Sequence, residues 1–68
     1  MITLIRYSRH ASERMIERGI SSNEVEDAIR KGSTEMQGSK MLHHYRHFTA
    51  VTIRINKDTF VITVMLRC

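Results

Sequence analysis

Apolar and polar positions follow two different periods along this chain, and the change from one to the other falls at Gly32. Over about residues 9–18 and 21–31, apolar side chains recur every three or four positions, which predicts two short amphipathic helices. From residue 33 onward the pattern is that of strands, rich in β-branched and apolar residues. A short apolar run at residues 2–5 predicts one further strand before the helices. The predicted element order is therefore βααββββ, and the fold class is α+β.

The two predicted helices begin and end at residues that satisfy free backbone groups. Ser8 suits the N-cap of the first helix. Gly19 suits a left-handed end of that helix, with Ile20 packing back onto its last turn. Ser21 and Glu24 have the spacing of a capping box, so the second helix begins at once. A narrow apolar stripe runs along the second helix, namely Val25, Ala28 and Ile29.

Four strands are predicted after the helices, at about residues 34–37, 40–47, 50–56 and 59–66. Turn signals lie at residues 38–39 and 56–58. The last strand is apolar on both faces, which is typical of a strand in the interior of a sheet. Nothing at residues 47–49 forces a turn, so one long bent strand is an alternative there. We expect both helices to pack on a mainly antiparallel sheet within a single domain, residues 1–68.

The length limits what the chain can do by itself. A protein of 68 residues buries one small core, and such domains are often completed by a partner or a second copy. Cys68 is the only cysteine, which excludes a disulfide framework and a cysteine-based zinc site. No apolar run is long enough to cross a bilayer, and the first residues lack the pattern of a signal peptide. We therefore expect a cytoplasmic protein that has no membrane contact and that forms a homodimer or binds a partner.

Charge is distributed unevenly along the sequence. Eleven basic and seven acidic residues give a net charge of +4 and a sequence pI near 9.8. Residues 13–27 hold five of the seven acids, whereas residues 28–68 hold seven of the bases and three of the four histidines. Most of the bases are arginines, whose guanidinium groups match phosphate and carboxylate groups. A segregated basic half favours a nucleic-acid partner, and a charge that only keeps the domain in solution is the alternative.

Three basic residues of the first helix, His10, Arg14 and Arg18, are spaced four apart and therefore lie on one helix face. We call them the basic row. Ala11 and Met15 lie beside the row, so it borders the core, and the apolar positions of this helix are expected to face the interior. Two arginines can clamp a phosphoryl group, and a histidine can transfer protons near neutral pH. A solvated helix face paired with nearby acids is the alternative.

A second candidate stretch lies at residues 42–47. A strand there places His43, Tyr45 and His47 on one face and His44 with Arg46 on the other. Histidines four apart on a strand are roughly 13 Å from each other, too far to share one ion, so we expect no metal site. Tyr45 or a histidine of this stretch is then a candidate proton donor, and Arg46 is a candidate phosphate contact. An exposed edge strand kept soluble by these residues is the alternative.

Further candidate contacts to a nucleic acid are scattered along the second half of the chain: Lys40, His44, Arg54 and Arg67. Two tyrosines and two phenylalanines make a poor platform for base stacking, which disfavours an aromatic reader of single strands. Nucleophile motifs, phosphate-cradling glycine loops and paired catalytic acids are absent from the sequence. We therefore expect no cofactor.

Several motifs together resemble a small prokaryotic family, domain of unknown function 4258. They are HAxxRMxxRGI at residues 10–20, SxxEV at 21–25, AI at 28–29 followed by a glycine, and VITV at 61–64. In element order that family is similar to RelE-like and BrnT-like toxin ribonucleases. The resemblance implies a RelE-toxin-like fold with an active site on the sheet, metal-independent RNA cleavage and a cognate antitoxin.

The resemblance carries only the basic row over to this chain, because His10, Arg14 and Arg18 stand on the matched motif. Tyr45 and Arg46 join them as candidate catalytic residues by residue type and chain position. In this interpretation the ribose 2′-oxygen attacks its own phosphate, a histidine or tyrosine transfers protons, and arginines neutralise the transition state. The target RNA, including any on the ribosome, is not specified by the sequence. The alternatives are a non-catalytic RNA- or protein-binding module and a structural protein completed by a partner.

Overall fold

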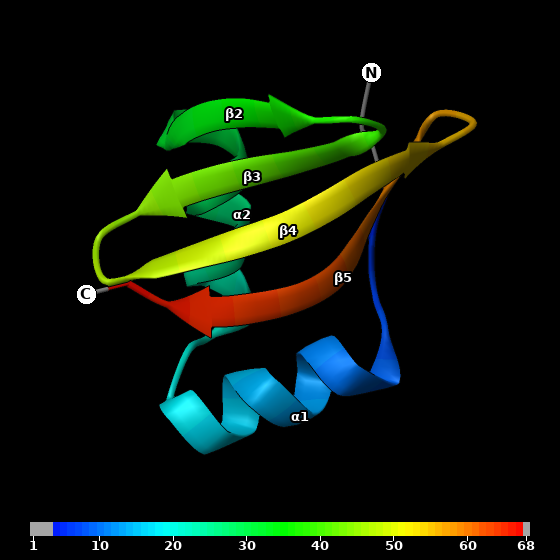
Figure 1. Cartoon of the computed structure of the whole chain (residues 1–68). Coiled ribbons are helices and arrows are strands. Elements are labelled where there is room, and N and C mark those ends of the chain that lie inside the picture. Colours follow the sequence, from blue (N-terminus) through cyan, green and yellow to red (C-terminus); the bar gives the residue numbers. More distant parts are fainter. Residues whose placement is uncertain (1–3, 68) are drawn as a thin grey trace.

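The structure, a computed structural model, describes residues 4–67, in which two helices and five strands follow the predicted order (Figure 1). The elements are β1 (Ile5–Tyr7), α1 (Arg9–Arg18), α2 (Ser22–Lys31), β2 (Ser33–Gln37), β3 (Lys40–Tyr45), β4 (Phe48–Ile55) and β5 (Asp58–Leu66). The α+β class is therefore confirmed. Of the strand predicted at residues 2–5, residues 2 and 3 lie outside the described part. The observed strand continues to Tyr7 because its backbone pairs with β5.

The five strands form one sheet in the order β1-β5-β4-β3-β2. Strands β2 to β5 form an antiparallel meander, and β1 pairs with β5 in parallel. Both helices lie on the same side of this sheet, with α1 against β5 and α2 against β3 and β4 (Figure 1). The core lies between the helices and the sheet, and no helix of the described residues covers the opposite, open face.

Helix α1 has the predicted ends. The Ser8 side chain accepts a hydrogen bond from the Ala11 N–H at 2.9 Å, as an N-cap does. Gly19 has φ 68°, and the Ile20 N–H donates to the Met15 carbonyl at 2.9 Å. These two features define a Schellman end, in which Ile20 returns to the core beside Met15.

The apolar stripe of α1 is narrower than the sequence predicts. Ala11 and Met15 are buried, as expected for positions beside the basic row. Ile16, however, is 82% exposed, so the expectation that all apolar positions of this helix face the interior is wrong. Ile16 stands about 100° from Met15 around the helix axis, and α1 contacts the sheet along one line only. The Ile16 side chain therefore points away from the sheet.

Helix α2 begins at the predicted capping box, in which Ser21 and Glu24 satisfy each other's free groups. It ends where the sequence predicts, at Gly32, whose backbone is extended with φ −73°. The glycine is required by space, because a Cβ at this position would lie 2.6 Å from the carbonyl oxygens of both Ala28 and His44. The end of α2 therefore sits directly on the backbone of β3.

The turn between β3 and β4 differs from the prediction. A strand over residues 40–47 and the alternative of one long bent strand are both wrong, because Arg46 and His47 form a two-residue turn. Arg46 has φ 52°, a left-handed conformation that costs a residue with a Cβ about 1–2 kcal/mol. The other two hairpin turns begin with Gly38 and Asn56, whose φ angles are 61° and 56°. Glycine and asparagine adopt the left-handed conformation readily, so these two turns could be predicted from the sequence, whereas the turn at Arg46 could not.

The last strand is interior along part of its length only. Strand β1 pairs with β5 at Thr59–Val61, and among the described residues no strand continues that edge toward Leu66. Helix α1 lies against β5, and Val64 is only 2% exposed. A helix therefore covers the sheet edge that the short β1 leaves open.

The two glycines Gly32 and Gly38 should respond differently to alanine. Gly32→Ala places a methyl group against two backbone oxygens that cannot rotate away, so we expect the free energy of unfolding to fall by about 3 kcal/mol. In Gly38→Ala the added methyl group meets no neighbouring atom within 4 Å. Only the left-handed backbone disfavours alanine there, so the free energy of unfolding should fall by about 1 kcal/mol. Urea unfolding of the two variants measures both values. Equal losses would contradict the close approach of α2 to β3.

Candidate functional site

The basic row lines one wall of an open groove between α1 and β5. His10, Arg14 and Arg18 face residues 63–66 of β5 across a volume of about 440 Å³, which we call the α1–β5 groove. The helical spacing that the sequence displays therefore does bring these three side chains into one concave surface. Their polar heads are accessible, since His10 and Arg18 are exposed and the Arg14 side chain is 41% exposed.

Arg14 contacts one residue on each side of it along α1, His10 within the groove wall and Glu17 outside the groove lining. Its Nε donates a hydrogen bond to His10 Nε2 at 3.4 Å, and its Nη1 lies 3.7 Å from Glu17 Oε1. Because a guanidinium can only donate, His10 accepts at Nε2 and carries its proton on Nδ1 in this arrangement. The ion pair with Glu17 is exposed and contributes little to stability. The groove thus offers a proton acceptor, His10 Nε2, beside a guanidinium.

Tyr45, Arg46 and Arg67 gather at a different place, the end of the molecule that holds the β3–β4 turn (Figure 1). The Arg46 guanidinium lies 5.3 Å from the centre of the Tyr45 ring. The Arg67 N–H donates to the His47 carbonyl at 2.8 Å, and its side chain donates to the Arg46 carbonyl at 3.5 Å. None of these residues lines the α1–β5 groove.

Glu24, at the start of α2, lies near enough to this basic turn for the charges of the turn to act on it. Its hydrogen bond from the Ser21 backbone N–H holds the pKa of the Glu24 carboxyl below its usual value, and the positive charges of His47 and Arg46 add to the effect. The charges of the β3–β4 turn therefore act on an acidic residue of α2. The other three predicted contacts are dispersed, with Lys40 at the far end of β3, His44 on the open face and Arg54 beside a separate cavity.

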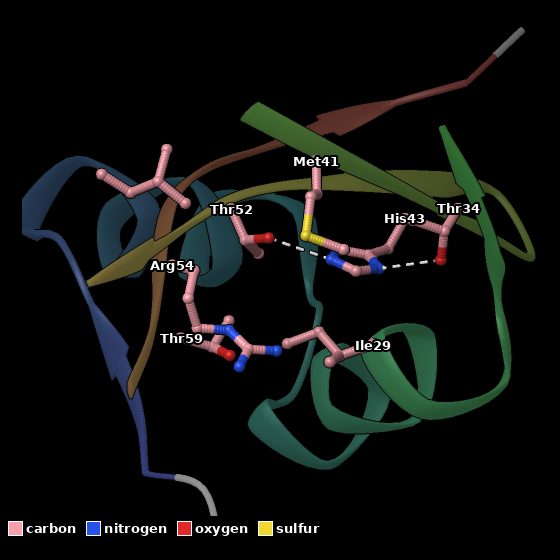
Figure 2. Close-up of a pocket in the computed structure, with 8 residues that line it drawn as sticks. Ile29, Thr34, Met41, His43, Thr52, Arg54 and Thr59 are labelled. Atoms are coloured by element: carbon pink, nitrogen blue, oxygen red, sulfur yellow. Dashed lines mark hydrogen bonds between the residues drawn. The ribbon is translucent and has the colours of Figure 1, made fainter. Parts of the chain in front are cut away.

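That cavity, of about 130 Å³, lies between α2 and the helix-facing side of the sheet (Figure 2). His43 stands in its inner wall and is 3% exposed. Its Nε2 is 2.9 Å from the Thr52 hydroxyl, and its Nδ1 is 3.4 Å from the Thr34 hydroxyl. Burial lowers the pKa of His43, and the neighbouring His44 lowers it further. His43 is therefore a neutral, hydrogen-bonded histidine.

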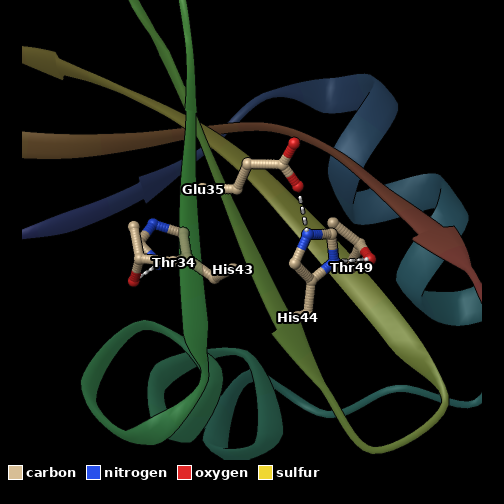
Figure 3. A network of polar contacts seen from close by, with 5 residues as sticks. All are labelled: Thr34, Glu35, His43, His44 and Thr49. Carbon is tan, nitrogen blue, oxygen red and sulfur yellow. Dashed lines mark hydrogen bonds and ion pairs between the residues drawn. The ribbon is translucent and has the colours of Figure 1, made fainter.

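On the open face, His44 joins an acid and a hydroxyl from the two neighbouring strands (Figure 3). Glu35 Oε1 is 3.0 Å from His44 Nε2, and His44 Nδ1 is 2.8 Å from the Thr49 hydroxyl. The order of acid, imidazole and hydroxyl is that of a catalytic triad. Thr49, however, is only 3% exposed, so its hydroxyl is not accessible to a substrate. The network is structural and ties β2, β3 and β4 together.

The sequence did not identify the partners of the buried His43 or of the half-buried His44. It did place His43 and His44 on opposite faces of a strand, which the register confirms. The threonines and the glutamate that bind them come from β2 and β4, nine or five positions away. Only the register of three strands could have identified them, because no local pattern joins these residues.

The described residues contain no group of three or more histidine, cysteine, aspartate or glutamate side chains that could hold a metal ion. Neither helix of that part of the chain has the length and apolar character needed to cross a membrane.

Comparison with known proteins gives one match. A family model described as "Domain of unknown function (DUF4258)" matches residues 7–66, a stretch that includes the basic row and all of β2, β3 and β4. No curated protein and no solved structure matches the chain.

The buried His43 should make the stability of the protein depend on pH. Because its pKa is lowered in the folded state, the unfolded chain binds the proton more readily as the pH falls below about 6.5. The stabilisation is therefore present above this pH and is lost as the pH falls toward the folded pKa. We expect urea unfolding to show a decline in stability from pH 7 to pH 5, which His43→Gln makes shallower.

The matched control for this measurement is His10→Gln, since His10 is exposed on α1. This variant should keep the slope of the wild-type protein. An unchanged slope in His43→Gln would show that burial of His43 does not control the pH dependence.

Proposed function

The chain belongs to the family of the domain of unknown function (DUF4258), and from the groove that its shared motif lines we propose a function in RNA cleavage. In this proposal the protein is a toxin-type, metal-independent endoribonuclease that binds RNA in the α1–β5 groove. The observation that carries it is the position of His10, Arg14 and Arg18 on one wall of one groove. RNA on the ribosome as the target and a cognate antitoxin as the partner belong to the same proposal.

The arginines of the row suit a phosphodiester backbone. Arg14 and Arg18 are about 6 Å apart along the helix axis, so both can contact one strand of a polynucleotide. Their guanidinium groups donate several hydrogen bonds without accepting any, which favours phosphate oxygens. The opposite wall, residues 63–66 of β5, holds no charged residue that would repel the strand.

His10 is the proton-transfer group of this proposal. Its Nε2 can take the proton of a ribose 2′-hydroxyl once the Arg14 Nε–H turns from it toward the phosphate. The 2′-oxygen then forms a bond to the adjacent phosphorus as the bond to the 5′-oxygen breaks. A water molecule protonates the leaving oxygen, and the hydroxide that remains takes the proton back from His10. The products are a 2′,3′-cyclic phosphate and a 5′-hydroxyl. Arg14 and Arg18 stabilise the charge that develops on the phosphoryl oxygens.

A non-catalytic RNA-binding module is the second candidate. The observation that favours it is that His10 is the only proton-transferring side chain among the residues that line the groove. Tyr45, the predicted proton donor, stands at the β3–β4 turn instead.

Replacement of His10 separates these two functions. With unstructured RNA and excess chelator, the wild-type protein should cleave, and His10→Ala should lower the rate by about 10²–10⁴-fold while RNA affinity changes little. Cleavage is followed by gel electrophoresis and binding by fluorescence anisotropy. Salt-dependent binding without cleavage by the wild-type protein would leave the binding module as the function.

Arginine variants test the groove itself. Arg14→Ala and Arg18→Ala should each weaken RNA binding and reduce the slope of log affinity against log salt by about 0.7. Arg9→Ala is the matched control, because Arg9 stands on the same helix outside the groove, pairs with Glu13 and has a 94% exposed side chain. If Arg9→Ala weakens binding as much as Arg14→Ala does, RNA does not bind in the groove.

A further inference from the structure

A polar patch interrupts the core on the helix-facing side of the sheet. Cross-strand partners share a face, so the positions in line with the core residues Phe48 and Ala50 face the helices. Further along the same face, His43, Thr52 and Thr59 are 3%, 1% and 7% exposed. A polar group buried at a core position costs free energy unless it is hydrogen-bonded, so each polar group of this patch needs a partner.

The patch forms the inner wall of the 130 Å³ cavity beside α2 (Figure 2). Thr34 and Arg54 stand at its mouth, where both residues are exposed. Ile29, Met41 and Ile53 complete the lining. Figure 2 shows the Arg54 side chain extending past Thr59 toward Ile29, with its guanidinium across the cavity from His43. A cation therefore borders a small concave space that is lined by hydroxyl groups.

In the inner wall of the cavity, one threonine hydroxyl keeps a hydrogen that His43 does not use. A neutral imidazole has one N–H donor and one acceptor nitrogen, and each ring nitrogen of His43 faces one threonine hydroxyl. One of these hydroxyls donates to the ring, whereas the other accepts from it. The hydroxyl that accepts keeps its own hydrogen free for a further partner. Thr59 and the five N–H groups of Arg54 add donors on the same side.

We propose that this cavity binds a small oxyanion, a phosphate or carboxylate group, with Arg54 as its counter-ion and the threonine hydroxyls as additional donors. No aspartate or glutamate lines the cavity, which disfavours a cation. A volume of 130 Å³ corresponds to about four water molecules, enough for one such group but not for a nucleoside. The site is separate from the α1–β5 groove and does not rest on the proposed RNA function.

Titration of the full chain with inorganic phosphate, and separately with acetate, tests this site. At pH 7.5 and constant ionic strength, saturable shifts of the Thr34, His43 and Thr59 amide signals in NMR spectra are expected with at least one of the two anions. The melting temperature should rise with the concentration of that anion, because only the folded state binds it. Preference for phosphate or for acetate then distinguishes the two sources of the oxyanion.

Arg54→Gln should weaken the affinity at least about tenfold, since a charged hydrogen bond is lost. Arg30→Gln is the matched control, because it removes the same charge from an exposed position on α2 outside the cavity. Equal binding by Arg54→Gln, shifts that never saturate, or no response to either anion would each overturn the proposal. RNA binding by Arg54→Gln is measured in parallel, and its preservation shows that the two sites are independent.

Discussion

The placement of every candidate site residue on α1 depends on one serine. Ser8 ends β1 and begins α1, and its hydroxyl accepts from the Ala11 N–H while it donates to the Ile62 carbonyl at 2.6 Å. Its backbone N–H donates to the Val61 carbonyl at 3.0 Å. One residue therefore caps the helix and fixes the start of that helix to the middle of β5. With this end fixed and Met15 buried in the core, α1 must run along β5 and present the basic row to it.

The attachment point on β5 is itself irregular. The register of β4 against β5 shifts between Val51 and Thr52, so that Ile62 is the extra residue of a bulge. The bulge lies next to the end of β1. At this point the edge of β5 is no longer paired with β1 and is covered by α1 instead. The short β1, the bulge and the N-cap thus lie together and fix the point where α1 starts along β5. The position of the α1–β5 groove depends on that point.

Local signals in the sequence predicted the parts of the fold that depend on neighbours in the chain. The caps at Ser8 and Gly19 and the capping box at Ser21 were predictable because each satisfies backbone groups within four residues. The turn at Arg46 was not, since arginine has no intrinsic preference for a left-handed backbone and is held there by the pairing of β3 with β4. The parallel pairing of β1 with β5 joins residues more than fifty positions apart, beyond any local pattern.

The same division applies to the candidate sites. The basic row was predictable from a spacing of four, but its opposite wall on β5 required the tertiary structure. Four histidines look equivalent in the sequence, yet they differ in the fold. His10 is exposed and accepts from an arginine, and His43 is buried and neutral. His44 joins Glu35 to Thr49, and His47 lies in a turn. Burial and the partners from other strands decide these roles, so residue type alone cannot assign chemistry.

Net charge alone also does not show where an anionic partner would bind. On the open face, Arg6 pairs with Asp58 at 3.4 Å and His44 lies 3.0 Å from Glu35, so acids offset the basic groups there. The positive charge of Arg46 in the basic turn acts on the nearby Glu24 carboxylate. In the α1–β5 groove, by contrast, the nearest acid to Arg14 is an exposed glutamate at 3.7 Å, outside the lining. Three basic residues therefore share one wall of this groove, and no acidic residue is among those that line it.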